Sequence, residues 1–116
     1  MPPLAGCLFC DMASGEIPVE RIAENEHAFA IRDINPRAPV HVLIIPIEHI
    51  ADAREIKATH AQHLTGLFAL AEEVGRLEGV HGSGYRLTFN VGDDAGMTIH
   101  HLHLHLVGGR SLGPEG

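Results

Sequence analysis

The sequence predicts an α+β domain in which a mainly antiparallel sheet packs against one long helix. Several short segments alternate between apolar and polar residues or are β-branched throughout, and one longer segment repeats its apolar residues at helical intervals. The connections between neighbouring strands are short enough for hairpins, which favours antiparallel pairing. With 116 residues the chain can bury one hydrophobic core but not two, so we expect residues 1–116 to form a single domain.

The first half of the chain contains a predicted hairpin. A short extended piece around Val19–Ile22 and a polar turn at Glu24–Glu26 lead into a strand from Ala28 to Asp33. The segment Asn35–Pro39 is a turn, because each proline fixes φ and keeps the preceding residue out of a helix. The apolar, β-branched run Val40–Pro46 then closes the hairpin as a buried strand.

The long helix is predicted to begin at Thr59, because Thr59 and Gln62 have the spacing of a capping box. The apolar residues that follow recur at helical intervals and form one stripe: Leu64, Leu67, Phe68, Ala71, Val74 and Leu77. Gly79 and the segment Gly82–Gly84 end the helix. We expect the apolar stripe to pack against the sheet.

Two further strands are predicted after the helix. Tyr85–Val91 alternates as a strand does, Gly92–Gly96 forms a turn, and His101–Val107 alternates again. These two segments are also separated by a short connection, so we expect them to extend the antiparallel sheet.

Three histidines alternate with leucines in the last predicted strand. Successive side chains of a strand point to opposite faces, so His101, His103 and His105 share one face while the leucines between them pack on the core. His100 is in register with the leucines and is a neighbour of this array, not a member. Such an array can bind a metal ion, act as a nucleophile at phosphorus, or simply form a solvated strand face.

The segment before the histidines favours phosphate as the ligand. The residues NVGDDAGMT contain a glycine turn, whose backbone N–H groups can bind an anion. Asn90 and Thr98 add side-chain donors at the two ends of this segment. Imidazole titrates near neutrality, so one histidine can attack phosphorus as the free base while its neighbours donate protons.

The overall charge excludes some partners. Eight basic and fifteen acidic residues give a net charge of −7 without any basic cluster, which argues against binding to DNA or RNA but not to a single nucleotide. The sequence contains no apolar run of membrane-spanning length, and its start, MPPLAGC, lacks the features of a signal peptide. We therefore expect no membrane partner and a cytoplasmic location, where Cys7 and Cys10 are reduced thiols or metal ligands.

The segment HLHLHLV resembles the signature of the histidine triad (HIT) family, His-x-His-x-His followed by two apolar residues. Three longer segments are similar, in the same order, to the nucleoside phosphoramidase branch of this family: CLFCDMASGEIP, AFAIRDINPRAPVHVLIIPIEHI and GYRLTFNVGDDAGMTIHHLHLHLVGGRSLGP. This resemblance spans Cys7–Pro114. It implies the HIT-like fold, with a five-stranded antiparallel sheet, and a homodimer in which two sheets join into one of ten strands, with the long helix at the interface.

The resemblance also implies an activity, the hydrolysis of purine nucleoside 5′-phosphoramidates at the bond between phosphorus and the amine nitrogen. By position, His103 is the nucleophile that forms a nucleotidyl-histidine intermediate. His101 and His41 match the residues that orient and tune this nucleophile, and His105 matches the residue that contacts the phosphate oxygens or the leaving group. No divalent cation is required for this chemistry when imidazolium stabilises the developing charge.

The same resemblance assigns the nucleotide-binding residues. Asp33 matches the carboxylate that accepts the ribose hydroxyls. The apolar slot for the base corresponds to Leu8, Phe9, Ile31 and Ile34, and the phosphate-binding turn to Asn90, Gly96 and Thr98. Without the resemblance, Asp33 is equally typical of a turn, Phe9 of a core, and His41 of a buried structural histidine.

The chain departs from this branch at two places. Met97, which the resemblance also assigns to nucleotide binding, stands where the branch usually has a polar residue, often glutamine. The tail SLGPEG is short and has no aromatic residue. These departures leave open a nucleotide-binding regulatory module with vestigial catalysis as the alternative function.

The pair Cys7 and Cys10 has the spacing of zinc ligands, but one such pair needs two further ligands. Some bacterial HIT proteins and the related galactose-1-phosphate uridylyltransferases resemble this chain here, which implies that His49 and His101 complete a structural zinc site. Such a site would anchor the N-terminal segment beside the catalytic strand. The alternatives are two buried thiols without a metal, or a zinc-dependent hydrolase in which the triad holds the ion.

Overall fold

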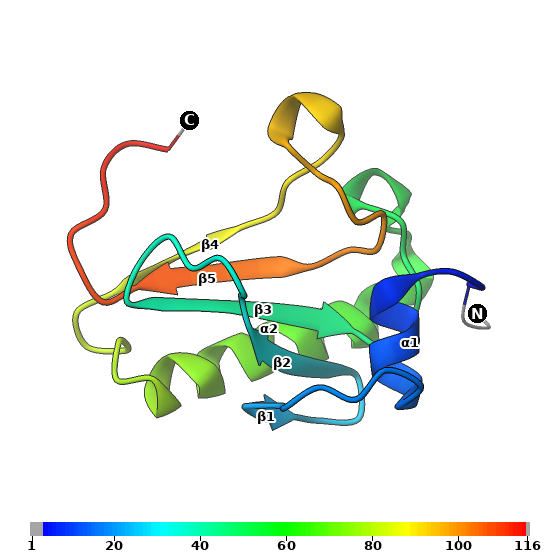
Figure 1. Ribbon diagram of the computed structural model, residues 1–116, viewed down its shortest axis with the longest axis horizontal. Coiled ribbons are helices and arrows are strands. Elements are labelled where there is room, and N and C mark those ends of the chain that lie inside the picture. Colours follow the sequence, from blue (N-terminus) through cyan, green and yellow to red (C-terminus); the bar gives the residue numbers. More distant parts are fainter. Residues whose placement is uncertain (1–3, 116) are drawn as a thin grey trace.

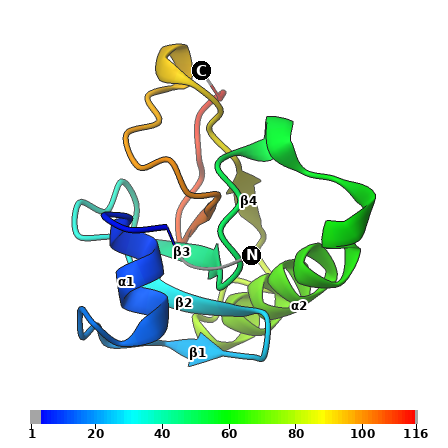
Figure 2. The same ribbon diagram turned by 90° about the vertical axis from the view of Figure 1, so that its right-hand side faces the viewer.

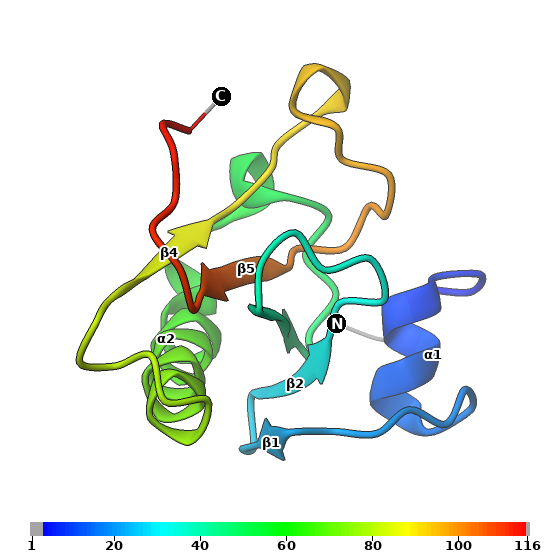
Figure 3. The same ribbon diagram turned by 60° about the vertical axis from the view of Figure 1, so that its left-hand side comes forward.

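The computed structural model describes residues 4–115, in which five strands form one antiparallel sheet in the order β1-β2-β3-β5-β4. The strands are β1 (Ala23–Glu24), β2 (Ala28–Arg32), β3 (Val40–Pro46), β4 (Tyr85–Thr88) and β5 (Leu104–Gly108). Helices α1 (Leu8–Ser14) and α2 (Ala61–Leu77) lie on opposite faces of the sheet (Figures 1, 2 and 3). Short 3-10 helices are η1 (Ala53–Glu55), η2 (Ala58–His60) and η3 (Asp93–Ala95). The predicted α+β class, with its five-stranded sheet and one long helix, is confirmed.

The face of the sheet toward α2 carries the main hydrophobic core. Alternate residues of β2, β3 and β5 point to this face, and each is at most 1 % exposed: Ala28, Ala30, Val42, Ile44, Leu104 and Leu106. From the helix, Leu67, Leu70 and Val74 pack against them. The predicted stripe of α2 thus covers the sheet, and the leucines between the histidines point to the core as expected.

The opposite face is only partly covered. Phe9 of α1 packs on Phe29, Ile31 and Ile45 at one end of this face. At the other end of the sheet the loop 33–39, the η3 loop and the tail after β5 all rise on one side of the molecule (Figure 1). These segments surround the histidines of β3 and β5.

The strand bounds differ from the prediction at both sides of the histidines. The strand predicted at His101–Val107 begins at Leu104. Continuing the register of β3 and β5 would place Leu102 opposite Pro46, which has no N–H to donate, and Leu102 donates instead to the carbonyl of Ile50 at 2.6 Å. The strand predicted at Tyr85–Val91 ends at Thr88.

The N-terminal elements also differ from the prediction. The extended piece around Val19–Ile22 lies just before β1, although Ile22 already donates to the carbonyl of Ala30 at 2.8 Å. Helix α1 was not predicted. Its signals are local: Sγ of Cys7 accepts a hydrogen bond from the backbone N–H of Cys10 in the first turn, and Gly15 ends the helix with φ of 88°.

The start of the long helix was wrong by two residues, and its end was correct. Thr59 lies inside η2, while α2 begins at Ala61 after His60. The ring of His60 accepts from the backbone of Lys57 at 3.0 Å and so closes the start of η2, while α2 follows without a side-chain cap. Gly79 follows the helix with φ of 75°, as its position predicts. Neither helix of the described chain is long and apolar enough to cross a membrane.

Candidate active site and metal centre

A cavity of about 640 Å³ opens between α1, the loop after β2 and the η3 loop. It is lined by Leu8, Phe9, Met12, Ile31, Arg32, Asp33, Ile34, Asn35, Arg37, Leu43, Asn90, Ala95, Gly96, Met97, Thr98, Ile99, His103 and His105. All nine residues that the sequence analysis assigned to nucleotide binding are among them. The structure therefore brings these residues together, while their individual roles stay predictions.

The cavity has an apolar end and a polar end. Ile34 lies at its rim with 92 % of its surface exposed, whereas Phe9 and Ile31 are buried in its wall. Met97, at the position where a polar residue was expected, is 5 % exposed and presents only apolar atoms. Apolar walls with a few polar groups are typical of small-molecule sites.

The hydrogen bond of His103 fixes its tautomer. Its Nδ1 lies 2.7 Å from the backbone carbonyl oxygen of His101, which can only accept, so Nδ1 carries the proton. The lone pair is then on Nε2, the nitrogen that a nucleophile needs free. Phe9 contacts the edge of this ring, with centroids 5.1 Å apart, and helps to hold its orientation.

A chain of donors ends at His105. The backbone N–H of Arg37 donates to Nδ1 of His41 at 3.1 Å, so the proton of neutral His41 is on Nε2. That Nε2 donates to Nδ1 of His105 at 3.0 Å and lies 3.3 Å from Oδ2 of Asp33. His105 therefore carries its own proton on Nε2, and Asn90 does not accept it, because the Asn90 atom 3.4 Å away is the donor Nδ2. The chain presents an N–H donor to the cavity.

Burial keeps these imidazoles neutral. Desolvation lowers the pKa of His103, which Asp33 and the His101 carbonyl only partly oppose. Desolvation, followed by the charges of His103, His41 and Arg37, lowers the pKa of His105 to about 4. The pKa of His41 is lowered by desolvation as well. At neutral pH the site thus holds an uncharged nucleophile beside an uncharged donor.

His101 lies before the start of β5, but it shares a neighbour with His103, because Phe9 contacts both rings, with centroids 5.8 and 5.1 Å away. His101 is fully buried, and its Nε2 donates to the carbonyl of Pro46 at 2.8 Å. Its Nδ1 points toward the cysteines. The rings of His103 and His105 do lie together, with centroids 5.2 Å apart. The chain leaves the ladder before Leu104, which lets His101 turn to a different partner.

Two cysteines and two histidines converge at the start of α1. Nδ1 of His101 lies 3.3 Å from Sγ of Cys7, 3.5 Å from Sγ of Cys10 and 3.1 Å from Nδ1 of His49. Nδ1 of His49 is also 3.3 Å from Sγ of Cys10. The four predicted ligands therefore form one cluster, with all ligand atoms within 4.8 Å of one another.

The donor set fits zinc. Tetrahedral zinc with bonds of about 2.0 to 2.3 Å places its nitrogen and sulfur ligands about 3.3 to 3.8 Å apart, close to the separations in this cluster. Because Nε2 of His101 donates to Pro46, its Nδ1 offers a lone pair. Desolvation raises the pKa of Cys10, so this buried thiol needs a cation to become a thiolate. Bound zinc would tie α1 to the segment before β5.

A second group of potential ligands, Asp33, His41 and His105, does not fit a cation. A metal on Nε2 of His41 would require the proton on Nδ1, but Nδ1 faces the N–H of Arg37. Two donors would then point at each other. Neither potential metal site among the described residues includes His103, so the geometry does not support a zinc-dependent hydrolase held by the triad.

Seven residues that line the cavity were missed from the sequence: Met12, Arg32, Asn35, Arg37, Leu43, Ala95 and Ile99. Met12 and Leu43 are apolar residues of α1 and β3, and nothing in their local pattern distinguishes them from core residues. Arg37 has a stronger signal, because it lies between Asp33 and His41 in the turn that follows β2. Its guanidinium nitrogen is 3.5 Å from Nδ1 of His105.

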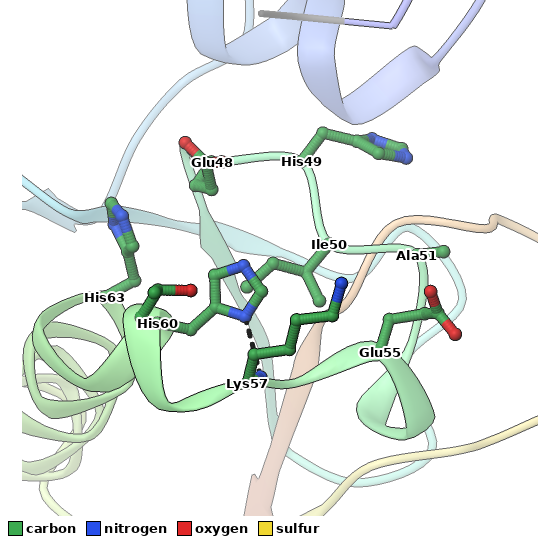
Figure 4. A pocket seen from close by; sticks show the side chains of 9 residues that line it. Glu48, His49, Ile50, Ala51, Glu55, Lys57, His60 and His63 are labelled. Carbon is green, nitrogen blue, oxygen red and sulfur yellow. Dashed lines mark hydrogen bonds between the residues drawn. The ribbon is translucent and has the colours of Figure 1, made fainter. Parts of the chain in front are cut away.

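Another cavity, of about 500 Å³, lies between residues 48–51 and the start of α2 (Figure 4). Glu55, Lys57, His60 and His63 line it, together with His49. The ring of His49 points away from the other side chains, toward the cysteine cluster (Figure 4). This cavity is therefore separate from the one that holds His103.

Known proteins share both the sequence and the fold. A model of the HIT domain matches residues 14–112, which include the three alternating histidines but not the two cysteines. A HIT-like protein of Azospirillum brasilense is 43 % identical over 109 residues, covering 92 % of this chain and 88 % of the relative. The purine nucleoside phosphoramidase of Escherichia coli is 37 % identical over 107 residues, covering 92 % and 90 %.

The solved structure of a HIT family hydrolase from Clostridium thermocellum superposes with a TM-score of 0.91 at 47 % identity, covering 97 % of each chain. The family model covers most of this chain, and relatives well above 30 % identity span nearly all of it. With the five-stranded sheet and the His103–His105 pair already in place, the chain belongs to the histidine triad (HIT) family.

Proposed function

We propose that this protein hydrolyses purine nucleoside 5′-phosphoramidates through a covalent nucleotidyl-histidine at His103. The observation that carries the proposal is the hydrogen bond from Nδ1 of His103 to the His101 carbonyl, which leaves Nε2 unprotonated in the wall of the cavity. The Escherichia coli relative, a purine nucleoside phosphoramidase, supports the same chemistry.

In the first step, Nε2 of His103 forms a bond to the α-phosphorus and the bond from phosphorus to the amine nitrogen breaks. The electron pair stays on the amine, which takes the proton from Nε2 of His105. Nε2 of His41, which donates to Nδ1 of His105 at 3.0 Å, stabilises His105 once that proton is lost. In the second step, water gives a proton back to Nε2 of His105 while its hydroxyl bonds to phosphorus, and the bond between phosphorus and Nε2 of His103 breaks to release the nucleoside monophosphate.

The remaining contacts follow the shape of the cavity. We assign the base to the apolar end formed by Leu8, Phe9, Ile31 and Ile34, and the ribose hydroxyls to Asp33. The phosphate lies near Asn90, Gly96 and Thr98, where η3 ends and Gly96 adopts φ of 80°. Zinc at Cys7, Cys10, His49 and His101 would supply no chemistry; it would hold α1 and the His101 carbonyl in place.

We also propose the homodimer with a ten-stranded sheet. Strand β4 is an edge of the sheet, and Leu87 on this strand is 38 % exposed. Next to it, Phe68 of α2 is 46 % exposed and stacks edge-on against Phe89. An unpaired edge beside exposed apolar side chains favours pairing with a second copy. A cytoplasmic location stays a prediction of the sequence.

The experiment is to trap the intermediate. The protein is mixed with adenosine 5′-phosphoramidate, quenched rapidly without acid, digested and analysed by mass spectrometry. We expect adenylate on the peptide that contains His103, and release of adenosine monophosphate in solution. The His103→Ala variant should give neither, whereas His100→Ala, which changes an exposed imidazole outside the cavity, should give both. Undiminished turnover by His103→Ala contradicts the proposal.

A further inference from the structure

A third cavity, of about 450 Å³, adjoins the catalytic one. Arg37, Asn90 and Ala95 line both cavities, so the two are continuous past His105. Its floor is the part of the sheet that α1 leaves open, because Arg86 and Thr88 of β4 pair with Val107 and His105 of β5. The chain after β5, which closes its outer side, turns back above β4 (Figure 1).

Three guanidinium groups from distant parts of the chain line this cavity. Arg37 comes from the turn after β2, Arg86 from β4 and Arg110 from the segment after β5. They are three of the eight basic residues in a chain of net charge −7. The cavity is therefore a local positive site in an acidic protein.

Two of these arginines, Arg37 and Arg110, differ from the arginines elsewhere in the chain by having no acidic partner among the described residues. Arg21, Arg32, Arg54 and Arg76 each lie against a carboxylate. Among residues 4–115, no carboxylate lies within ion-pair distance of Arg37 or Arg110.

Arg86 does have an acidic partner, Glu115, at 3.6 Å. The side chain of Glu115 is 83 % exposed, so solvent screens this pair strongly. Most of the positive charge in the cavity is thus not neutralised by the protein itself.

Backbone contacts hold the three side chains in place. Arg110 donates to the carbonyl of Arg37 at 2.8 Å, and Arg86 donates to the carbonyl of Gly113 at 2.8 Å. Arg37 reaches within 3.5 Å of Nδ1 of His105. Each guanidinium has five N–H donors, so donors remain for a ligand after these contacts.

We propose that this cavity binds the leaving group, and that the preferred substrates release an amine carrying a carboxylate or a phosphate. The inference rests on the proposed function. In-line displacement at phosphorus directs the leaving group away from His103, and the space beyond His105 and Asn90 on that path is the arginine-lined cavity. The planar fork of arginine matches the oxygens of carboxylate and phosphate.

The charge of the cavity also defines what it rejects. A cationic amine would meet three guanidinium groups and a single acidic side chain, Glu115. A neutral leaving group would form no ion pair with the arginines and would lack the two anionic oxygens that a guanidinium binds at once. Selectivity should therefore follow the charge of the leaving group and not its size.

The test compares adenosine 5′-phosphoramidates whose leaving groups are matched in length. β-Alanine carries a carboxylate, β-alanine amide is neutral, and aminoethyl phosphate carries a phosphate; the unsubstituted phosphoramidate serves as reference. We expect kcat/KM for at least one anionic substrate to exceed that of the amide by about tenfold or more. The carboxylate and phosphate arms identify which anion is preferred.

Variants connect this preference to the arginines. Arg37→Gln and Arg86→Gln should each reduce the ratio of anionic to neutral kcat/KM several-fold. Arg76→Gln, which removes a cation paired with Glu72 on α2, should leave the ratio unchanged. Glu115→Gln should raise it, because the competing carboxylate is removed.

The two proposals fail in different ways. Equal kcat/KM for the anionic and neutral substrates, or a ratio that survives both arginine variants, overturns the leaving-group site while hydrolysis of the reference upholds the proposed function. If no phosphoramidate is hydrolysed, the proposed function fails. The site is then judged by titrating the same substrates onto the His103→Ala variant, where equal dissociation constants overturn it.

Discussion

The two faces of the sheet, one under α2 and one under α1, are made by the same strands but carry different side chains and are covered to different extents. Under α2, alternate residues from Ala28 to Leu106 are aliphatic, almost fully buried and covered along most of their length. Under α1, only the end near Phe29 is covered, and the rest of the face carries His41, His105 and Arg86 beside two cavities.

This difference separates stability from chemistry. The covered face gains free energy by burying apolar surface and has no group that could react. On the open face, burial removes water from the imidazoles. This desolvation lowers the pKa of His105 to about 4 and lowers that of His103, which keeps His103 in the neutral form that can attack phosphorus. Neighbouring residues of a single segment serve the two purposes by pointing in opposite directions.

The largest expected effects come from breaking each face at adjacent residues. His103→Ala should lower kcat by at least about 10³-fold, because it removes the proposed nucleophile, with little change in stability. Leu104→Ala should lower the free energy of unfolding by about 2 to 5 kcal/mol, because it leaves a cavity in the core under α2. Urea unfolding and turnover per folded molecule measure the two effects separately.

The separation of stability from chemistry is contradicted if either variant shows the effect expected of the other. A Leu104→Ala protein that is fully folded but inactive would place the leucine in the site, and a strongly destabilised His103→Ala protein would make the histidine a core residue.

The next effect concerns the cysteine cluster, which fastens α1 to the open face. We expect one zinc per chain by elemental analysis. Its removal by a chelator should lower Tm by on the order of 10 °C, since a ligand at a hundred times its Kd contributes about 2.7 kcal/mol. The Cys10→Ser variant should hold less zinc, and its Tm should not respond to the chelator.

His60→Ala is the matched control, because this ring lies outside the cluster. It should keep both the metal and the response to chelator. A wild-type Tm that does not change on chelation, with no zinc detected, would leave Cys7 and Cys10 as plain buried thiols.

The smallest effect tests how tightly α2 packs against the sheet. A Cβ added at Gly75 of α2 would lie 2.8 Å from Cε1 of Tyr85. Glycine to alanine within a helix ordinarily stabilises by about 1 kcal/mol, but here the crowding should reverse the sign and cost about 1 to 3 kcal/mol. Urea unfolding of Gly75→Ala, alone and with Tyr85→Ala, measures this.

In the Tyr85→Ala background the alanine should become neutral or stabilising, because the ring that it would touch is gone. A stabilised single variant would show that α2 and β4 can separate at little cost, and that this face is not tightly packed.

Much of the fold could be predicted because its signals are local. The run Val40–Pro46 became β3 with the predicted bounds, and the periodic apolar stripe became the buried side of α2. Errors arose where a distant contact overrode the local pattern. Pro46 and Ile50 draw the chain out of the ladder before Leu104.

In the candidate site, too, some residues could be predicted from the sequence and others depend on distant contacts. The residues that the family resemblance identified, such as Asp33 and Thr98, do line one cavity. They could be identified because the resemblance covers nearly the whole chain. Arg110 could not be found this way, and the only signal for Arg37 is its place between Asp33 and His41. Each is an isolated arginine in a turn, and only the return of the last segment beside the loop after β2 brings them together, with a hydrogen bond of 2.8 Å.

The amino-acid sequence by itself determined which side chains alternate, and hence that Leu104 and Leu106 would point to one face of the sheet and His105 to the other. That follows from the period of two in an extended backbone, which needs no knowledge of other segments. Only the tertiary structure decided that His101 faces the cysteines, that His103 presents Nε2, and that three arginines share one cavity. Those outcomes depend on hydrogen bonds and contacts between residues far apart in the chain, which no local pattern encodes.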